Sequence, residues 1–218
     1  MTKLQSLQRL HRLSSGRSMI EMLGVLAIIG VLSVGGIAGY SKAMEKFKIN
    51  KTAEQISQIA INIQTLYAQQ TTYDGLNNTS AISMGVIPDD LGTNAGNGRL
   101  TNLFNGNVEI SSGYYNSKYF GIVYKGISKN ACIQLATLDW GSSGSSGLYG
   151  IEAGTYGTDV TTHIDATTSI CGQNSTPAGL IACSHKGSNT IGIPVPVSTA
   201  SQFCTCTSNT CFISVVFE

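Results

Sequence analysis

The clearest pattern in this sequence is a run of uncharged, mostly apolar residues close to the N-terminus. No charged residue occurs from Met22 to Ser41, and Glu21 stands directly before this run. Because about 20 apolar residues are enough for a helix to cross a bilayer, the run predicts a membrane-spanning helix. A carboxylate costs about 2.5–3.5 kcal/mol at the bilayer centre on insertion scales, so its position beside the run predicts a functional role for Glu21.

A second periodic pattern follows the uncharged run without a break. No proline occurs before Pro88, and apolar residues recur in steps of four and three, at Ile49, Ala53, Ile56, Ala60, Ile63 and Tyr67. These steps predict one helix with a buried face, which Ile59 and Leu66 widen. The polar residues expected on its other faces are Lys51, Gln55, Gln58, Asn62 and Gln69. We expect a single helix from about Met19 to Thr72, roughly 80 Å long at 1.5 Å per residue.

The two halves of this helix have different surfaces. The first half is apolar on all sides, which predicts burial in lipid or among other copies of itself. The second half is amphipathic, which predicts packing against a globular domain. A parallel coiled-coil dimer is the alternative interpretation of the heptad steps.

The remainder of the chain has the pattern of a β-rich domain. Residues 75–106 are rich in Asn, Gly, Thr and Ser, which predicts a connecting loop with short helical pieces and a turn at Pro88–Asp90. Ser128 is a suitable N-cap for a short helix over residues 128–137. The glycine- and serine-rich segment Gly141–Gly147 predicts a flexible linker. Strands are expected at residues 108–111, 119–124, 148–151, 191–197 and 211–217.

Charge and cysteine content favour an exported domain. Residues 1–16 hold three of the 13 Lys and Arg residues and none of the 12 acidic ones, so 10 basic residues remain against 12 acidic ones. No basic field therefore points to nucleic acid. The six cysteines all follow the apolar run, which predicts disulfides formed in an oxidising compartment. Zinc is the alternative, although Cys204 and Cys206 lack the two-residue spacing of typical zinc ligand pairs.

No catalytic constellation is evident. His11 lies in the basic segment, while His163, near Asp165, and His185 lie in polar stretches typical of exposed loops. The sequence contains no phosphate-binding glycine motif, nucleophile elbow or zinc-protease motif. We expect a protein that is not an enzyme and that needs neither cofactor nor metal.

The N-terminal residues resemble the class III leader of type IV prepilins. Residues 1–16 are basic and end in Gly16, Glu21 follows four residues after Arg17, and the apolar run begins at once. In that family a prepilin peptidase cleaves after the glycine on the cytoplasmic side, so the mature chain keeps its apolar run. The family usually has Phe or Met after the cut, where this chain has Arg17. An ordinary secretory signal or a simple anchor is the alternative, with a small-residue cleavage site near 41–43.

The resemblance implies roles for five residues in this segment. Cleavage between Gly16 and Arg17 creates a new α-amino group, and Arg17 is the candidate for N-methylation. Glu21 of one subunit is expected to pair with the amino group of its neighbour and to set the axial register of a filament. Gly35 and Gly36 are candidates for a bend or melted segment in the assembled fibre. The alternatives are a simple interfacial role for Glu21 and ordinary helix-packing roles for the glycines.

Residues from 119 to 140 and the cysteine-flanked final strand look like the head of a type IVb pilin. In that family a cysteine of the short helix is bridged to one just before the last strand, which implies Cys132–Cys204. Local spacing suggests a tight turn closed by Cys206–Cys211 and a surface loop closed by Cys171–Cys183. Six cysteines allow 15 pairings, and an exchange of Cys204 with Cys206 is the main alternative.

These observations predict an α+β fold, in which a long N-terminal α-helix packs on an antiparallel β-sheet head with disulfides. The expected segments are a leader (1–16), a transmembrane or fibre-core helix (17–41), an amphipathic helix (42–73) and a disulfide-bonded head (74–218). The resemblance implies a major or minor structural subunit of a type IVb-like pilus. It also implies an inner-membrane precursor that becomes part of an extracellular filament on a bacterial cell. The implied partners are other pilin subunits, the prepilin peptidase, and the inner-membrane assembly platform with its ATPase.

Two alternatives remain open at this stage. One is a pseudopilin of a type II secretion machine, which shares the leader and the helix but commonly has a smaller head with fewer cysteines. The other is a membrane-tethered extracellular binding protein or enzyme that does not polymerise.

Overall fold

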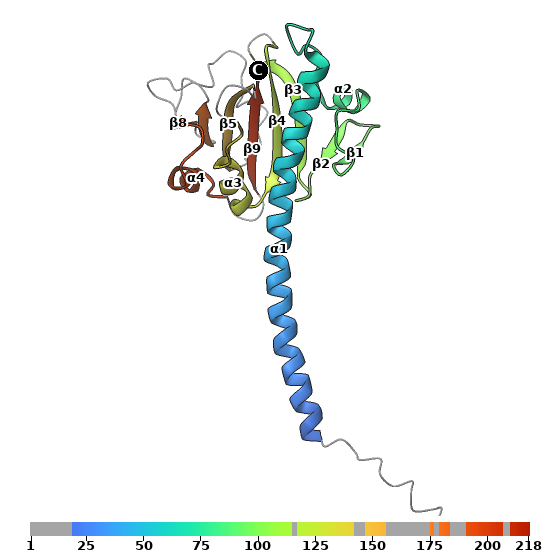
Figure 1. Cartoon of the computed structure of the whole chain (residues 1–218), viewed down its shortest axis with the longest axis vertical. Coiled ribbons are helices and arrows are strands. Elements are labelled where there is room, and N and C mark those ends of the chain that lie inside the picture. Colours follow the sequence, from blue (N-terminus) through green and yellow to red (C-terminus); the bar gives the residue numbers. More distant parts are fainter. Residues whose placement is uncertain are drawn as a thin grey trace, which may run out of the picture. The chain divides into compact units, whose positions relative to one another are not determined.

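The computed structural model describes residues 19–114, 117–141, 147–155, 175–176, 179–183, 191–206 and 210–218. Contacts divide the chain into two compact units, of which the first ends at Met44 and the second spans Glu45–Glu218. Helix α1 (Met19–Tyr67) supplies the described part of the first unit and opens the second (Figure 1). The predicted α+β class is confirmed, since the second unit combines helices with an antiparallel sheet.

The buried face of α1 in the second unit follows the predicted heptad steps. Its buried side chains are Ile49, Thr52, Gln55, Ile56, Ile59, Ala60, Ile63 and Tyr67, and Ala53 packs against the same core. Two predictions for this helix were wrong. Leu66 lies at the edge of the face in the last turn and is 50% exposed. Gln55 is fully buried, because its Oε1 accepts a hydrogen bond from the buried Tyr124 hydroxyl at 3.3 Å.

Helix α1 ends at Tyr67, five residues before the predicted end near Thr72. The residues after Tyr67 are Ala-Gln-Gln-Thr-Thr, which offer no large apolar side chain to bury. The Gln70 amide donates to the Tyr67 carbonyl at 2.8 Å in a turn. Tyr73 then packs on Tyr67 and on Phe120, with ring centroids 5.2 and 4.6 Å apart. The turn after Tyr67 therefore brings the Tyr73 ring against the aromatic side chains at this end of the core.

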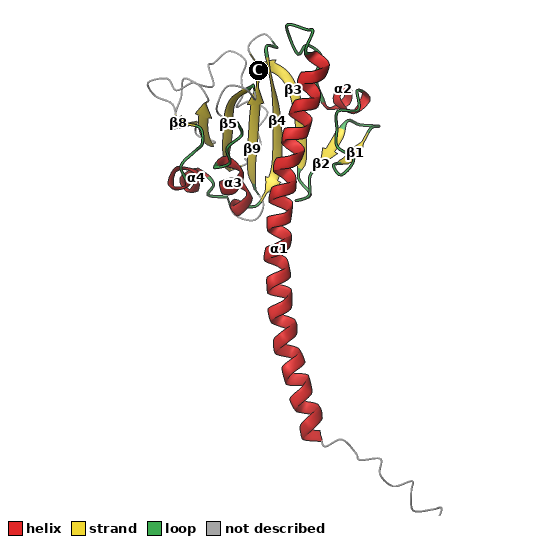
Figure 2. Cartoon of the chain, in the orientation of Figure 1, coloured by secondary structure: helices red, strands yellow, loops and turns green. Residues whose placement is uncertain are grey.

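A single sheet forms the centre of the second unit (Figure 2). Its strands are β1 (Gly92–Asn94), β2 (Arg99–Thr101), β3 (Asn107–Tyr114), β4 (Tyr119–Ile127), β5 (Leu148–Thr155), β6 (Ser175–Thr176), β7 (Gly179–Cys183), β8 (Ile191–Gly192) and β9 (Cys211–Phe217). Their order is β1-β2-β3-β4-β9-β5-β7-β6, with β8 beside β7. All pairs are antiparallel except β7 with β8.

The C-terminal strand β9 is the middle of this sheet. Val215 is in register with Ile122 of β4 on one side and with Ile151 of β5 on the other. All seven residues of β9 are buried, as expected for a strand covered on both faces. One face packs against the core that includes Ile56, Ile59 and Ile63 of α1. Strand β9 therefore joins the two sides of the sheet and contributes to the core.

Four of the predicted strands are confirmed, as parts of β3, β4, β5 and β9. The fifth predicted strand, over residues 191–197, is confirmed only at its first two residues, which form β8. The rest of this prediction is wrong, because Pro194 and Pro196 lack the amide hydrogen that a β-ladder needs. Helix α4 (Val197–Phe203) begins there with Pro196 at the N-cap position. The loop region 75–106 contains helix α2 (Asn78–Ser83), as expected, and also strands β1 and β2, which were not predicted.

Helix α3 (Lys129–Ala136) begins as the sequence predicts. The Ser128 hydroxyl oxygen accepts a hydrogen bond from the Ala131 amide at 3.1 Å, and the same hydroxyl donates to Glu45 Oε1 on α1 at 2.8 Å. The Trp140 indole donates to the Leu135 carbonyl at 3.0 Å and closes the other end of α3. Ser128 therefore caps α3 and also links it to α1 through a hydrogen bond.

Two polar side chains lie buried side by side on β5 and β9. Glu152 is 2% exposed, Ser214 is fully buried, and the two residues are in register. Glu152 Oε1 and Ser214 Oγ have no hydrogen-bond partner among the described residues. Burial raises the pKa of Glu152 to about 7, because a carboxylate away from water is disfavoured.

We predict that Ser128→Ala lowers the free energy of unfolding by about 1 kcal/mol, the typical cost of losing an N-cap. Urea unfolding of the full chain in detergent, followed by Trp140 fluorescence, measures this change. Ser57→Ala is the control, because its exposed hydroxyl bonds only the Ala53 carbonyl four residues earlier. Equal stability of the Ser128 variant and the control would show that the cap does not contribute.

We also predict that stability falls as the pH rises from about 4.5 to about 7. In that interval Glu152 holds its proton in the folded chain but loses it in the unfolded chain, so the folded state binds more protons. Glu152→Gln should remove this slope and, near pH 8, raise stability by up to about 3 kcal/mol. Thermal unfolding over this pH range tests the prediction, with Glu54→Gln on the exposed face of α1 as control. A slope that persists in the Glu152 variant would contradict it.

Candidate functional site

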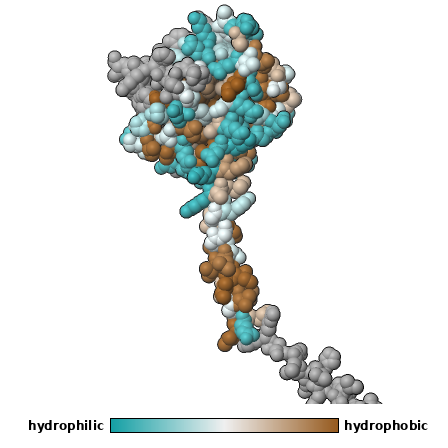
Figure 3. Space-filling model, viewed as in Figure 1, coloured by the Kyte–Doolittle hydropathy of each residue, from teal (hydrophilic) through white to brown (hydrophobic). Residues whose placement is uncertain are grey.

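The first half of α1 presents an apolar surface that no described residue covers. Its exposed large side chains are Met19, Ile20, Met22, Leu23, Val25, Leu26, Ile28, Ile29, Val31, Leu32, Val34, Ile37 and Tyr40. Figure 3 shows the hydrophobic residues gathered along this helix. By length and composition, α1 alone among the described helices qualifies as a candidate membrane span. A helix that is apolar all round is stable only when lipid or other protein surrounds it.

Glu21 lies in the first turn of α1 and is exposed. An anion near a helix N-terminus is favourable by about 0.3–1 kcal/mol, because the first amide groups carry partial positive charge. Gly16 and Arg17, the predicted cleavage site and new N-terminus, lie outside the described residues. The pairing of Glu21 with a neighbour's α-amino group therefore stays a prediction.

Helix α1 is continuous through Gly35 and Gly36. No other atom lies within 4 Å of the position that a Cβ would take at either glycine. The fold of a single chain therefore does not require glycine at these two positions. Glycine at these two positions is compatible with close helix packing between chains. It is also compatible with local loss of helical structure.

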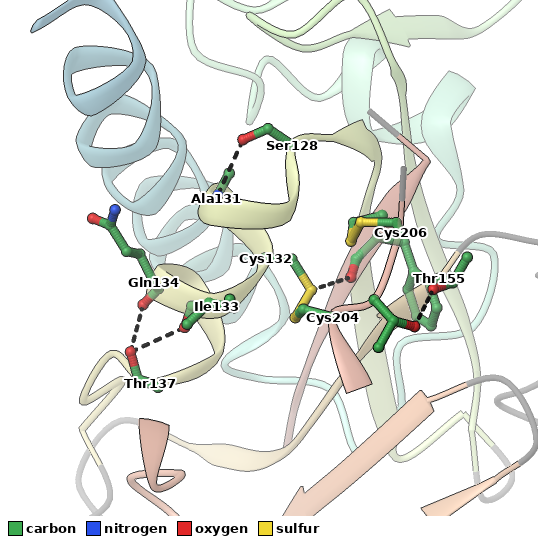
Figure 4. The surroundings of a disulfide bond; sticks show 12 residues. Ser128, Ala131, Cys132, Ile133, Gln134, Thr137, Thr155, Cys204 and Cys206 are labelled. Atoms are coloured by element: carbon green, nitrogen blue, oxygen red, sulfur yellow. Dashed lines mark hydrogen bonds between the residues drawn. A yellow bond between two sulfur atoms is a disulfide. The ribbon is translucent and has the colours of Figure 1, made fainter. Parts of the chain in front are cut away.

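Two disulfides lie together at the end of the sheet, and they join the pairs that the sequence analysis expected. Cys132 of α3 is bonded to Cys204, which directly follows α4, and their Cα atoms are 5.9 Å apart (Figure 4). Cys206 is bonded to Cys211, the first residue of β9, with Cα atoms 5.5 Å apart. The first bond links α3 to α4, and the second fixes the start of the central strand.

The remaining cysteine prediction falls partly outside the structure. Cys183 ends β7, but Cys171 lies outside the described residues, so the Cys171–Cys183 pair stays a prediction. The histidines weighed as acid–base or metal groups, His163 and His185, also lie outside them.

One feature of the disulfide region was missed by sequence reasoning. The Sγ atoms of Cys132, Cys204 and Cys211 all lie within 4.8 Å of one another, and the three residues are buried. In this oxidised form the sulfurs are bonded in pairs, so they do not offer the thiolates that zinc requires. The short spacing of Cys204, Cys206 and Cys211 places Cys211 near Cys204, whereas the packing of α3 against β9 brings Cys132 to the same place.

Comparisons with known proteins agree on one family. The family model described as PilS N terminal matches residues 46–210, which is more than half of the chain. The major structural subunit of bundle-forming pilus from Escherichia coli O127:H6 is 28% identical over 114 residues. That match covers 52% of this chain and 58% of the relative, so the chain spans little more than half of the relative's length.

The solved structure of another pilin shares the fold. The crystal structure of TcpA, a type IV pilin from Vibrio cholerae El Tor biotype, aligns with a TM-score of 0.54. The alignment has 20% sequence identity and covers 78% of this chain and 99% of TcpA. A type IV b pilin from Salmonella typhi aligns with a TM-score of 0.45 at 17% identity, over 78% of this chain and 97% of its own. Because the family match covers more than half of the chain, the chain belongs to the PilS family, and the fold that it shares with TcpA is that of a type IV pilin.

Proposed function

We propose that this chain is a structural subunit of a type IVb-like pilus and polymerises through the first half of α1. The observation that carries the proposal is the exposed apolar surface of residues 19–40, which no residue in the described part of the chain covers. Lipid covers such a surface in the precursor, and copies of the same helix cover it in a filament. The bundle-forming pilus relative, a major structural subunit by name, supports the same function.

In this proposal the precursor is held in the inner membrane with its leader on the cytoplasmic side. A prepilin peptidase cuts between Gly16 and Arg17, and Arg17 becomes the N-terminal residue that can be methylated. The assembly platform and its ATPase then move the subunit from lipid into the fibre. The oxidised head, with its buried disulfides, is exposed at the cell surface.

Glu21 sets the register of each incoming subunit in this scheme. Its carboxylate enters an apolar fibre core, where an unpaired charge is costly. The α-amino group of Arg17 in the next subunit offsets that cost. Each copy then carries one anion and one cation, and such a head-to-tail contact does not close, so it generates a helical filament. Gly35 and Gly36 allow α1 to bend or lose helical structure as the copies pack.

We predict that Glu21→Ala blocks fibre formation and leaves folded protein in the membrane. Removal of one partner from a buried ion pair costs about 3–5 kcal/mol, so we expect a roughly hundredfold or greater fall in surface fibres. Electron microscopy and immunoblots of sheared surface material against membrane fractions measure this. Glu54→Ala is the matched control, since Glu54 is an exposed glutamate on the same helix. Normal fibres from the Glu21 variant would contradict the proposed register.

We predict that Gly16→Ala prevents leader removal, so the uncut precursor accumulates in the membrane and no fibres form. A shift in mass of the membrane-held chain, measured together with the fibre count, tests this prediction. Ser14→Ala is the control for a small change in the same leader, because it leaves Gly16 and Arg17 unchanged. Fibres built from an uncut Gly16 variant would rule out cleavage as a required step.

A further inference from the structure

The two disulfides described above lie next to each other in the head. Cys211 Sγ lies within 4.8 Å of the sulfurs of Cys132 and Cys204, although it is bonded to Cys206. Cys206 is not a member of this close group. One bridge therefore places its Cys211 sulfur beside the other bridge.

The fold fixes Cys211 in this position. It begins β9 and is in register with Ile127 of β4 and with Thr155 of β5. Cys132 reaches the same place from α3, and Cys204 does so from the end of α4. Cys132, Cys204 and Cys211 are fully buried. Three separate elements therefore place the sulfurs, and no loop movement is needed to bring them together.

Thiolates exchange with disulfides by direct attack on one of the two sulfurs. The attacking sulfur forms a new bond, and the other sulfur leaves as a thiolate that takes up a proton. No oxidant is consumed, because the number of disulfides is unchanged. In the oxidised head Cys211 cannot attack, since its sulfur is already bonded to Cys206.

We propose that Cys132, Cys204 and Cys211 form a thiol–disulfide exchange site, which the Cys206–Cys211 bond keeps closed. A dithiol reductant opens that bond, becomes a disulfide itself, and leaves Cys206 and Cys211 as thiols. The Cys211 thiolate then attacks the Cys132–Cys204 disulfide. The products are a disulfide from Cys211 to Cys204 or Cys132 and one released thiol on the other residue. The covalent link between α3 and α4 is replaced by a link to the central strand.

The full-length Cys206→Ser variant in detergent tests this site, because it leaves Cys211 as a free thiol without added reductant. The matched control is Cys211→Ser, which leaves Cys206 free in the same segment but outside the close group. Both proteins are incubated at about pH 8.5, where a free cysteine in water is half ionised. Free thiols are then blocked by alkylation, and mass spectrometry assigns the disulfides. Trp140 fluorescence monitors the native fold throughout.

We expect disulfides from Cys211 to Cys204 or Cys132 in the Cys206 variant, formed about tenfold or more faster than any exchange in the control, because the reacting sulfurs are already held together. Equal rates in the two variants, or exchange that begins only when native fluorescence is lost, would overturn the proposal. Should the Cys206 variant fail to fold, limiting dithiothreitol on the wild-type protein provides the second test. In that test, a disulfide from Cys211 to Cys132 or Cys204 supports the exchange site. A product that keeps the Cys132–Cys204 disulfide and has free thiols on Cys206 and Cys211 refutes it.

Discussion

The apolar first half of α1 is the constraint on which the function of this pilin depends. Each large apolar side chain contributes about 1.5–3 kcal/mol when it is fully buried, and this segment exposes more than ten of them. Their combined burial far outweighs the roughly 3 kcal/mol cost of moving one carboxylate toward hydrocarbon. The apolar surface therefore supplies the driving force for insertion or assembly, while the role proposed for Glu21 is to select one register among many.

The second unit is organised around the central strand β9. It lies between β4 and β5, and all of its residues are buried, so the two sides of the sheet are joined only through this strand. The disulfide from Cys206 holds the start of this strand. The bridge from Cys132 holds the helices next to it. Closing a loop of this length contributes about 4 kcal/mol in the chain-entropy model, which is appreciable for a head of this size.

Sequence reasoning was most successful where one residue type meets one physical requirement. The heptad steps identified the buried face of α1, Ser128 identified the start of α3, and the β-branched C-terminal run identified β9. It failed for short strands such as β1, which spans only three residues, all of them exposed. It also failed where tertiary contacts override polarity, as for Gln55, whose burial depends on the distant Tyr124 hydroxyl.

The candidate functional site also has one part that the sequence predicted and another part that it did not. Glu21 and the apolar run could be recognised from charge and hydropathy alone. The closeness of Cys211 to Cys132 could not, because it depends on the packing of α3 against β9. The spacing of Gly16, Glu21 and the apolar run that identifies a leader is a local property of the sequence. The arrangement of the four sulfurs is a property of the whole head.

The most direct test of this account is intact-mass and N-terminal analysis of the subunit in purified surface filaments. The account predicts a chain that begins at Arg17 and retains the whole apolar half of α1. A surface form that begins after Tyr40, without this segment, would contradict it.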